Sequence, residues 1–210
     1  MEDIASKKVM IAVPAMDSVP THFAISLYNL RKPCMTRLEV VSNSLVYDSR
    51  NLLAAKAIDD DCDYVLWIDS DMVFNADLLE KLLEKIEGKD FISVLAFTRH
   101  LPVSPNAYVI DASKKSLRYK PIKNYPKNQL FKVDAAGFGT VLTSAKILKA
   151  VFDKYERPFN PDMGLGEDLT FCYRARQLGF DLWCDSSVKV GHVGRYVYSE
   201  NDYNTTLERE

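Results

Sequence analysis

The chain has 210 residues, of which 47% are hydrophobic and 27% charged, and its formal net charge at pH 7 is −2. These values indicate an ordinary globular domain with a sizeable core. The small net charge excludes the basic footprint that binds nucleic acid or an anionic membrane surface. No apolar run is long enough for an integral membrane segment, and the first eight residues lack the apolar stretch of a signal peptide, so we expect a cytoplasmic protein.

The first half of the chain alternates short apolar runs with amphipathic stretches. Strands are predicted at 9–13, 38–41, 64–68 and 91–97, and helices at 21–30, 49–59 and 76–86. Asn75 is the predicted N-cap of the third helix, in which Leu78, Leu79, Leu82, Leu83 and Ile86 form an apolar stripe. Strands that alternate with helices are typical of a parallel α/β sheet, which we predict for this half.

The pattern changes at Thr98. Residues 98–129 hold four prolines among short polar and aromatic pieces, which indicates an insertion of short strands or loops within the same domain. Regular elements then return as a strand from Phe131, a strand at 140–142, a helix capped by Ser144, a loop at 156–166, a helix at 167–178, and one or two strands over 182–190. The tail from residue 196 is polar and aromatic, and we expect poor order at its end.

The four cysteines, Cys34, Cys62, Cys172 and Cys184, show no C-x-x-C spacing. We therefore expect reduced and mostly buried thiols, with zinc binding or disulfides as the alternative.

Two carboxylates follow the most apolar strand, in the sequence Asp69-Ser70-Asp71. Ligands of parallel sheets bind outside the carboxyl ends of the strands, so these acids point to a site. Both carboxylates would face the same way if the strand geometry continued through Ser70. Such oxygen ligands suit Mg²⁺ or Mn²⁺ shared with a substrate phosphate, and the alternative is a pair of acids that only caps the strand end.

Two further motifs follow in order. They are Gly166-Glu167-Asp168 at the start of a helix and Gly191-His192 after the last strand. Together with the acidic strand end and with Ser49-Arg50-Asn51 on the preceding helix, these motifs resemble the GT-A fold glycosyltransferases, most closely family 2, over about residues 7–194. The second strand departs from the family, because Ser42-Asn43-Ser44 replaces an Asp-Asp-Gly-Ser turn, and the donor base stays open.

The resemblance implies a single α/β domain over residues 1–210, GT-A or Rossmann-like, with a mostly parallel central sheet flanked by helices. Residues 7–97 would form a nucleotide-binding half and 98–195 an acceptor-side half, with 196–210 as the tail. The implied activity is metal-dependent, inverting transfer of a hexose from a nucleoside diphosphate sugar to a carbohydrate or other hydroxyl acceptor. Mn²⁺ or Mg²⁺ is the implied cofactor, and the oligomeric state stays open.

The resemblance also implies the role of each matched residue. Asp71 would bind the metal directly, Asp69 would reach it through water or hold the donor ribose, and His192 would complete the metal site or touch the diphosphate. Arg50 would face the nucleotide or its phosphates, because a guanidinium matches phosphate oxygens; a helix-surface arginine is the alternative. Gly137 lies in a segment of small residues that permits close approach of the donor or of backbone.

The base for an inverting displacement is predicted at Asp168, with Glu167 as its support. Acids in a first helical turn are also favoured by the helix dipole without any catalysis, and that dipole should lower the basicity of Asp168. The aromatic residues Phe138, Phe159 and Phe171 are candidates for stacking on a sugar, and for Phe171 core packing is the favoured alternative. The pair Arg99-His100 is a weaker candidate for contact with donor or acceptor.

Two other functions fit parts of the sequence. Asp69-Ser70-Asp71-Met72-Val73 matches the nucleophile motif of haloacid-dehalogenase-like phosphatases, but those enzymes begin with this strand, whereas two strand–helix units precede it here. A catalytically inactive GT-A domain that binds carbohydrate or a partner protein is the non-enzymatic alternative.

Overall fold

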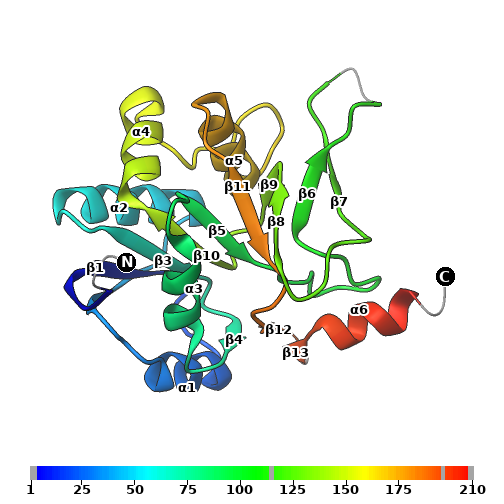
Figure 1. Ribbon diagram of the computed structural model, residues 1–210, viewed down its shortest axis with the longest axis horizontal. Coiled ribbons are helices and arrows are strands. Elements are labelled where there is room, and N and C mark those ends of the chain that lie inside the picture. The colour runs from blue at the N-terminus through cyan, green and yellow to red at the C-terminus, as the bar shows by residue number, and fades with distance from the viewer. Residues whose placement is uncertain (1–3, 114–115, 195–196, 208–210) are drawn as a thin grey trace.

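The apolar runs form a seven-stranded central sheet in the computed structural model, which describes residues 4–113, 116–194 and 197–207 (Figure 1). In order across the sheet the strands are β2 (Met35–Ser42), β1 (Lys8–Ala15), β3 (Tyr64–Ile68), β10 (Thr140–Ser144), β5 (Phe91–Val94), β11 (Leu182–Asp185) and β8 (Leu130–Val133). β10 and β8 run antiparallel to their neighbours, and the remaining strands run in one direction. The sheet is therefore mostly parallel, as predicted.

The strands of the first half, β2, β1, β3 and β5, run in one direction as predicted, but the antiparallel strand β10 lies among them. This strand belongs to the second half of the chain but lies between β3 and β5, with Val141 opposite Trp67 on one side and Ser93 on the other. These strands, far apart in sequence, pair here because all three are buried on both faces. No local sequence pattern specifies β10 as their neighbour. The two predicted halves consequently share one sheet.

Helices cover both faces of the sheet and bury alternate residues of its strands. The helices are α1 (Thr21–Asn29), α2 (Val46–Asp59), α3 (Leu78–Ile86), α4 (Ala145–Tyr155) and α5 (Glu167–Gln177), preceded by the 3₁₀ turn η1 (Ile4–Ser6). Met10 and Ala12 of β1 share a core with α2, α4 and α5, whereas Val9 and Ile11 share the opposite core with α1 and α3. The structure is thus a three-layer α/β domain.

The helix boundaries differ from prediction at two N-termini. α2 begins at Val46, three residues before the predicted start. The Asn75 cap is wrong, because α3 begins at Leu78 with Asp77 at the N-cap, and Asn75 contributes only its backbone carbonyl to the Leu78 amide. The leucine stripe of α3 is fully buried as predicted, and Ser144 does cap α4 by accepting from the Ile147 amide at 3.3 Å.

Two small sheets lie at the edge where the parallel strands end. One contains β4 (Met72–Phe74), β12 (Val190–Val193) and β13 (Val197–Tyr198); the other contains β6 (Ala107–Ile110), β7 (Tyr119–Pro121) and β9 (Ala135–Ala136). β3 ends at Ile68, and the chain turns before β4, so the strand does not continue through Ser70 as the sequence suggested. The second sheet confirms that residues 98–129 hold short strands.

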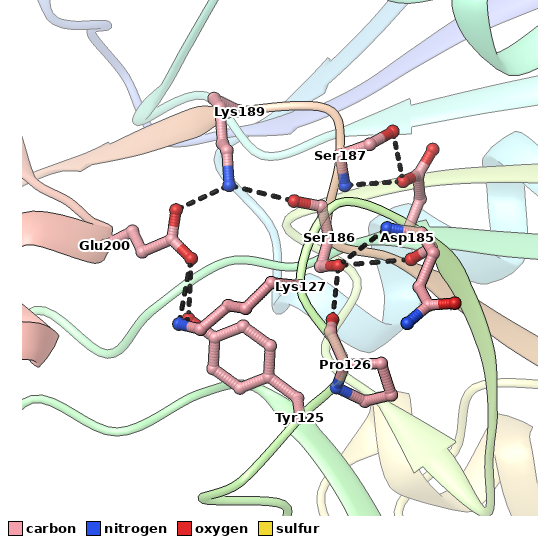
Figure 2. A network of polar contacts seen from close by, with 9 residues as sticks. Tyr125, Pro126, Lys127, Asp185, Ser186, Ser187, Lys189 and Glu200 are labelled. Atoms are coloured by element: carbon pink, nitrogen blue, oxygen red, sulfur yellow. Dashed lines mark hydrogen bonds and ion pairs between the residues drawn. The ribbon is translucent and has the colours of Figure 1, made fainter.

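The tail forms a helix, α6 (Glu200–Leu207), which the sequence pattern missed. Figure 2 shows its anchor: Glu200 accepts from Lys189 at 2.5 Å, and its other oxygen accepts from Tyr125 at 2.8 Å and Lys127 at 3.2 Å. Tyr203 is 3% exposed and stacks on Phe97 with ring centroids 5.3 Å apart. The predicted poor order concerns residues 208–210, which lie outside the described residues.

Two further predictions concern the oxidation state of the cysteines and the hydropathy of the helices. All four cysteines are free; Cys62, Cys172 and Cys184 are buried and Cys34 is partly buried, as predicted. Within the described residues, no helix combines the length and the apolar character needed to cross a membrane.

Candidate active site

The motifs meet in a cleft at the carboxyl ends of β1 and β3. Its lining comes from the loop after β1, from α2, from the turn after β3 and from the start of α5: Pro14, Ala15, Met16, Ser44, Val46, Ser49, Arg50, Asp69, Ser70, Asp71 and Glu167. This is the position at which an open α/β sheet binds its ligand.

The two aspartates of the turn face different partners. Asp69 Oδ1 accepts from Arg50 Nη2 at 2.8 Å. Asp71 Oδ2 lies 2.5 Å from Arg99 Nη1 and 3.3 Å from His192 Nε2. The Met72 amide donates to the Asp69 carbonyl at 3.1 Å, which closes a turn between the two acids. The carboxylates therefore diverge, because the strand geometry that would align them stops at Ile68.

His192 is held beside Asp71 by strand pairing. β12 runs antiparallel to β4 with His192 opposite Met72, and the Val193 amide donates to the Asp71 carbonyl at 2.8 Å. His192 Nδ1 lies 2.9 Å from the Phe97 carbonyl, which can only accept, so Nδ1 carries the proton and Nε2 faces Asp71. A backbone carbonyl orients metal-binding histidines in the same way.

The charges around Asp71 change its pKa and that of His192. Burial alone would raise the pKa of Asp71, but the hydrogen bond from His192 and the charges of His192 and Arg99 outweigh it and lower the pKa. Burial works to lower the pKa of His192, and the Asp71 carboxylate and the Phe97 carbonyl outweigh it and raise the pKa. Asp71 is consequently an anion at neutral pH, as a cation ligand must be.

The donor set at this point fits a divalent cation that is shared with a substrate. Among the described residues, no three or more His, Cys, Asp or Glu side chains gather into a complete metal site. Asp71 and His192 supply one oxygen and one nitrogen, both acceptable to Mn²⁺, and water and phosphate oxygens commonly complete such a site. Asp69 is turned toward Arg50 and is not placed as a direct third ligand.

Arg50 is 2% exposed, although it lines the cleft. Its guanidinium lies over the Phe138 ring at 5.1 Å, and its Nε is 3.8 Å from Glu167 Oε1. Arg50 Nε and Nη1 have no hydrogen-bond partner in the described structure. The near neighbours of this guanidinium are protein carboxylates, so Arg50 joins the turn after β3 to the start of α5. Its predicted contact with the nucleotide stays a prediction.

Glu167 and Asp168 are the first two residues of α5. Asp168 Oδ1 accepts from the Leu169 amide at 2.7 Å. Burial, followed by the Glu167 charge, raises the pKa of Asp168 to about 6. The expected lowering of its basicity by the helix N-terminus is therefore outweighed. The Asp168 charge also adds to burial in raising the pKa of Tyr108 on β6 to about 12, so the carboxyl lies on the side of the cleft toward the 98–129 insertion.

The predicted stacking on a sugar is wrong for Phe138 and Phe159, and the core packing favoured for Phe171 is confirmed. Phe138, Phe159 and Phe171 are at most 1% exposed and form an aromatic cluster with Trp67. Phe159 and Phe171 stack with ring centroids 4.7 Å apart. Their rings pack under Arg50 and are closed to a sugar.

Gly137 packs against Asn106, which a Cβ at that position would meet at 3.3 Å, and its donor-binding role stays a prediction. The glycine next to the acidic turn is Gly139, which sequence reasoning did not single out. The Gly139 carbonyl accepts from the Asp69 amide at 3.0 Å, and a Cβ there would lie 3.2 Å from Met72 Sδ. In the sequence, the feature that could have pointed to Gly139 is its position immediately before the strand β10.

Of the weaker candidates Arg99 and His100, only Arg99 contacts the acidic turn in the described structure. Arg99 reaches Asp71, whereas His100 is exposed. Arg99 follows β5 closely, and the position of that strand between β10 and β11 brings it to the site.

The sheet order and the acidic turn define the class of this protein as a GT-A fold, and solved structures bear this out. The protein A197 from STIV matches with a TM-score of 0.62 and 18% identity, over 93% of this chain and 91% of its own. GalNAc-T7, solved with UDP, GalNAc and Mn²⁺, matches with a TM-score of 0.63 and 12% identity over 99% of this chain. The match covers 48% of the GalNAc-T7 chain, so the present chain spans about half of that length.

The sequence itself identifies the family. Residues 38–151, more than half of the chain, match the family described as Glycosyl transferase family 2, and the chain belongs to that family. A search of curated proteins found no match to the chain.

Proposed function

We propose that this protein transfers a hexose from a nucleoside diphosphate sugar to a carbohydrate or other hydroxyl acceptor, with inversion and with Mn²⁺ or Mg²⁺. Membership of family 2 supports the transfer. The observation that carries the rest is the Asp71–His192 pair at the strand end, 3.3 Å apart, with the histidine tautomer set by the Phe97 carbonyl. The UDP, GalNAc and Mn²⁺ of the GalNAc-T7 structure support this donor and cofactor class.

Asp71 and His192 would hold the cation at the diphosphate. When bound, a divalent cation stabilises the negative charge that develops on the leaving diphosphate. Asp71 contributes an ionised oxygen because its pKa is lowered, and His192 presents Nε2 because Nδ1 is engaged. Asp69, on the other side of the turn, is free on Oδ2 to approach the donor ribose, because Arg50 occupies Oδ1.

Asp168 would accept the proton of the acceptor hydroxyl as that oxygen attacks the sugar carbon. A pKa of about 6 leaves the carboxylate ionised at neutral pH and keeps it basic enough for this step. Glu167 sustains that pKa through its like charge, and Arg50 holds Glu167 in place. One positioned base is sufficient for direct displacement, which supports inversion over retention.

The haloacid-dehalogenase-like phosphatase alternative gains no support from the comparisons, because the family match is to glycosyl transferases.

Thermal shifts with a panel of nucleoside diphosphate sugars, with and without Mn²⁺, test the proposal, because ligands of the native state raise its stability. We expect one donor to stabilise the protein in a Mn²⁺-dependent way and to be slowly hydrolysed. Asp71→Ala should remove the Mn²⁺-dependent part. The matched control is Asp181→Ala, which removes an aspartate paired with Lys132 on the surface.

Donor binding that is unchanged in Asp71→Ala, with and without Mn²⁺, would contradict the placement of the metal. Donor binding without transfer or hydrolysis would favour the inactive binding domain.

A further inference from the structure

Arg99 occupies the oxygen at which the proposed cation would bind. Its Nη1 lies 2.5 Å from Asp71 Oδ2, the same oxygen that faces His192 Nε2 at 3.3 Å. We propose that Arg99 is an exchangeable counter-cation: it neutralises Asp71 when no metal is bound, and it moves to the leaving diphosphate when metal and donor bind. This inference rests on the proposed function and adds a residue to its leaving-group site.

The loop that carries Arg99 has a hydrogen-bonded backbone, while the Arg99 side chain is exposed. The Thr98 amide donates to the Ser104 carbonyl at 2.9 Å, and the Ser104 amide donates to Thr98 Oγ1 at 3.0 Å. The adjacent Phe97 bridges Pro105. The Arg99 side chain, in contrast, is 57% exposed. Its guanidinium can therefore change partners while the backbone stays in place.

Electrostatics makes the two cations exclude each other at Asp71. A divalent ion bound to Oδ2 would lie within about 4 Å of a guanidinium on the same oxygen, where like charges repel each other strongly in a partly buried setting. Arg99 has little room to stay beside a bound cation, because His192 Nε2 also lies 3.3 Å from Asp71 Oδ2. Arg99 must leave when the cation arrives.

The diphosphate that arrives with the cation offers a displaced Arg99 a new anionic partner. Guanidinium groups bind phosphate oxygens through paired, charge-assisted hydrogen bonds. Among the described residues, three cationic side chains contact the acids of the turn: Arg50, Arg99 and His192. Arg50 is 2% exposed and His192 is held by the Phe97 carbonyl, so Arg99 is the member of this set that can follow a ligand.

Arg99→Gln tests the exchange, with Arg31→Gln as its matched control. Arg31 pairs with Glu80 at 2.5 Å and is 56% exposed, nearly the same as Arg99, but lies on the α1–α3 side of the sheet. The affinity for Mn²⁺ alone is read from the electron paramagnetic resonance signal of free Mn²⁺. The affinity for inorganic pyrophosphate at excess Mg²⁺, which carries the leaving-group charge without a base, is read by calorimetry.

We expect changes of opposite sign. Arg99→Gln should bind Mn²⁺ about two- to fivefold more tightly, because an exposed ion pair no longer competes. Its affinity for pyrophosphate should fall by about tenfold or more, because one charge-assisted hydrogen bond contributes roughly that factor to binding. Arg31→Gln should change neither.

Several results would overturn the exchange. They are unchanged Mn²⁺ and pyrophosphate affinities in Arg99→Gln, weakening of both, or tighter Mn²⁺ binding with unchanged pyrophosphate binding. Asp71→Asn separates this failure from failure of the proposed function. If that variant binds Mn²⁺ as the parent does, the cation lies elsewhere and both proposals fall; if it loses Mn²⁺ while Arg99→Gln is neutral, only the role of Arg99 falls.

Discussion

Two arginine–aspartate pairs meet at the turn between β3 and β4, and they differ in almost every physical respect. Arg50 is 2% exposed and pairs with Asp69. Arg99 is 57% exposed and pairs with Asp71. The buried arginine also contacts Glu167 and two aromatic rings, whereas the exposed arginine pairs with the Asp71 carboxylate.

The difference separates fixed parts of the site from exchangeable parts. A buried charge cannot leave its partner without a large desolvation penalty, so Arg50 holds Asp69 and the start of α5 in a constant geometry. An exposed pair contributes at most about 1 kcal/mol, so Asp71 can give up Arg99 for a ligand. The same three-residue turn thus serves both the framework and the ligand.

The largest effect is expected at the base, on the fixed side. Asp168→Asn should lower turnover by about 10²–10⁴-fold with donor affinity nearly unchanged, because a positioned base is lost while size and helix geometry are kept. Steady-state kinetics with the donor from the thermal-shift panel measure this. Glu167→Gln should do less. A more damaging Glu167→Gln would reverse the assignment, and full activity in both variants would place the base elsewhere.

The two arginines should differ in their effect on folding. Arg50→Met should lower the free energy of unfolding by about 2–4 kcal/mol, because it leaves Asp69 and Glu167 without their buried counter-charge. Arg99→Gln should change it by less than about 1 kcal/mol. Urea unfolding followed by circular dichroism compares the two, and equal effects would contradict the division into fixed and exchangeable pairs.

The fixed side should also carry a stability penalty at Asp168. Its pKa is about 6 in the folded protein, above the value of 3.8 for an unperturbed aspartate. The sign follows from linkage: the folded state binds the proton more tightly, so this group stabilises the fold below about pH 4 and loses that contribution as pH rises through about 6. Asp168→Asn should therefore raise the free energy of unfolding at pH 7 by about 1–3 kcal/mol, although it lowers turnover. A lower melting temperature than that of the parent protein would contradict this origin of the pKa.

The smallest effect is the pH dependence of activity. A base with a pKa of about 6 predicts that kcat/KM falls about tenfold for each pH unit below 6 and levels off above 7. The residual activity of Asp168→Asn should lack this decrease. If the decrease persists in that variant, protonation of another group, such as His192, controls it.

Much of the fold could be predicted because its signals are local. The leucine stripe of α3, the apolar strand β3 and the cap at Ser144 each depend on residues within one element or its boundary. The position of β10 could not be predicted, because pairing of Val141 with Trp67 joins residues far apart in sequence. The Asn75 cap was wrong because both Asn75 and Asp77 are polar residues close to the helix start, and the sequence pattern does not fix the first helical residue to within two positions.

The site shows the same limit. The motifs at Asp69, Asp71, Asp168 and His192 could be read from the sequence together with a family resemblance. The divergence of the two aspartates depends on where β3 stops, and the approach of Arg99 depends on the order of strands across the sheet. Burial of Phe138 and Phe159 likewise depends on how separate segments pack, so the aromatic character of these two residues alone suggested the wrong role.

The insertion of β10 between β3 and β5 also has a consequence for synthesis. Until residues 140–144 leave the ribosome, β3 at residues 64–68 has β1 on one side and an open edge on the other. At typical rates of synthesis the roughly seventy intervening residues take about 4–15 s to appear. During that interval the nascent chain exposes an apolar strand edge, which is the kind of surface that aggregates or recruits chaperones. A chain interrupted before Ser144 would keep that edge open permanently.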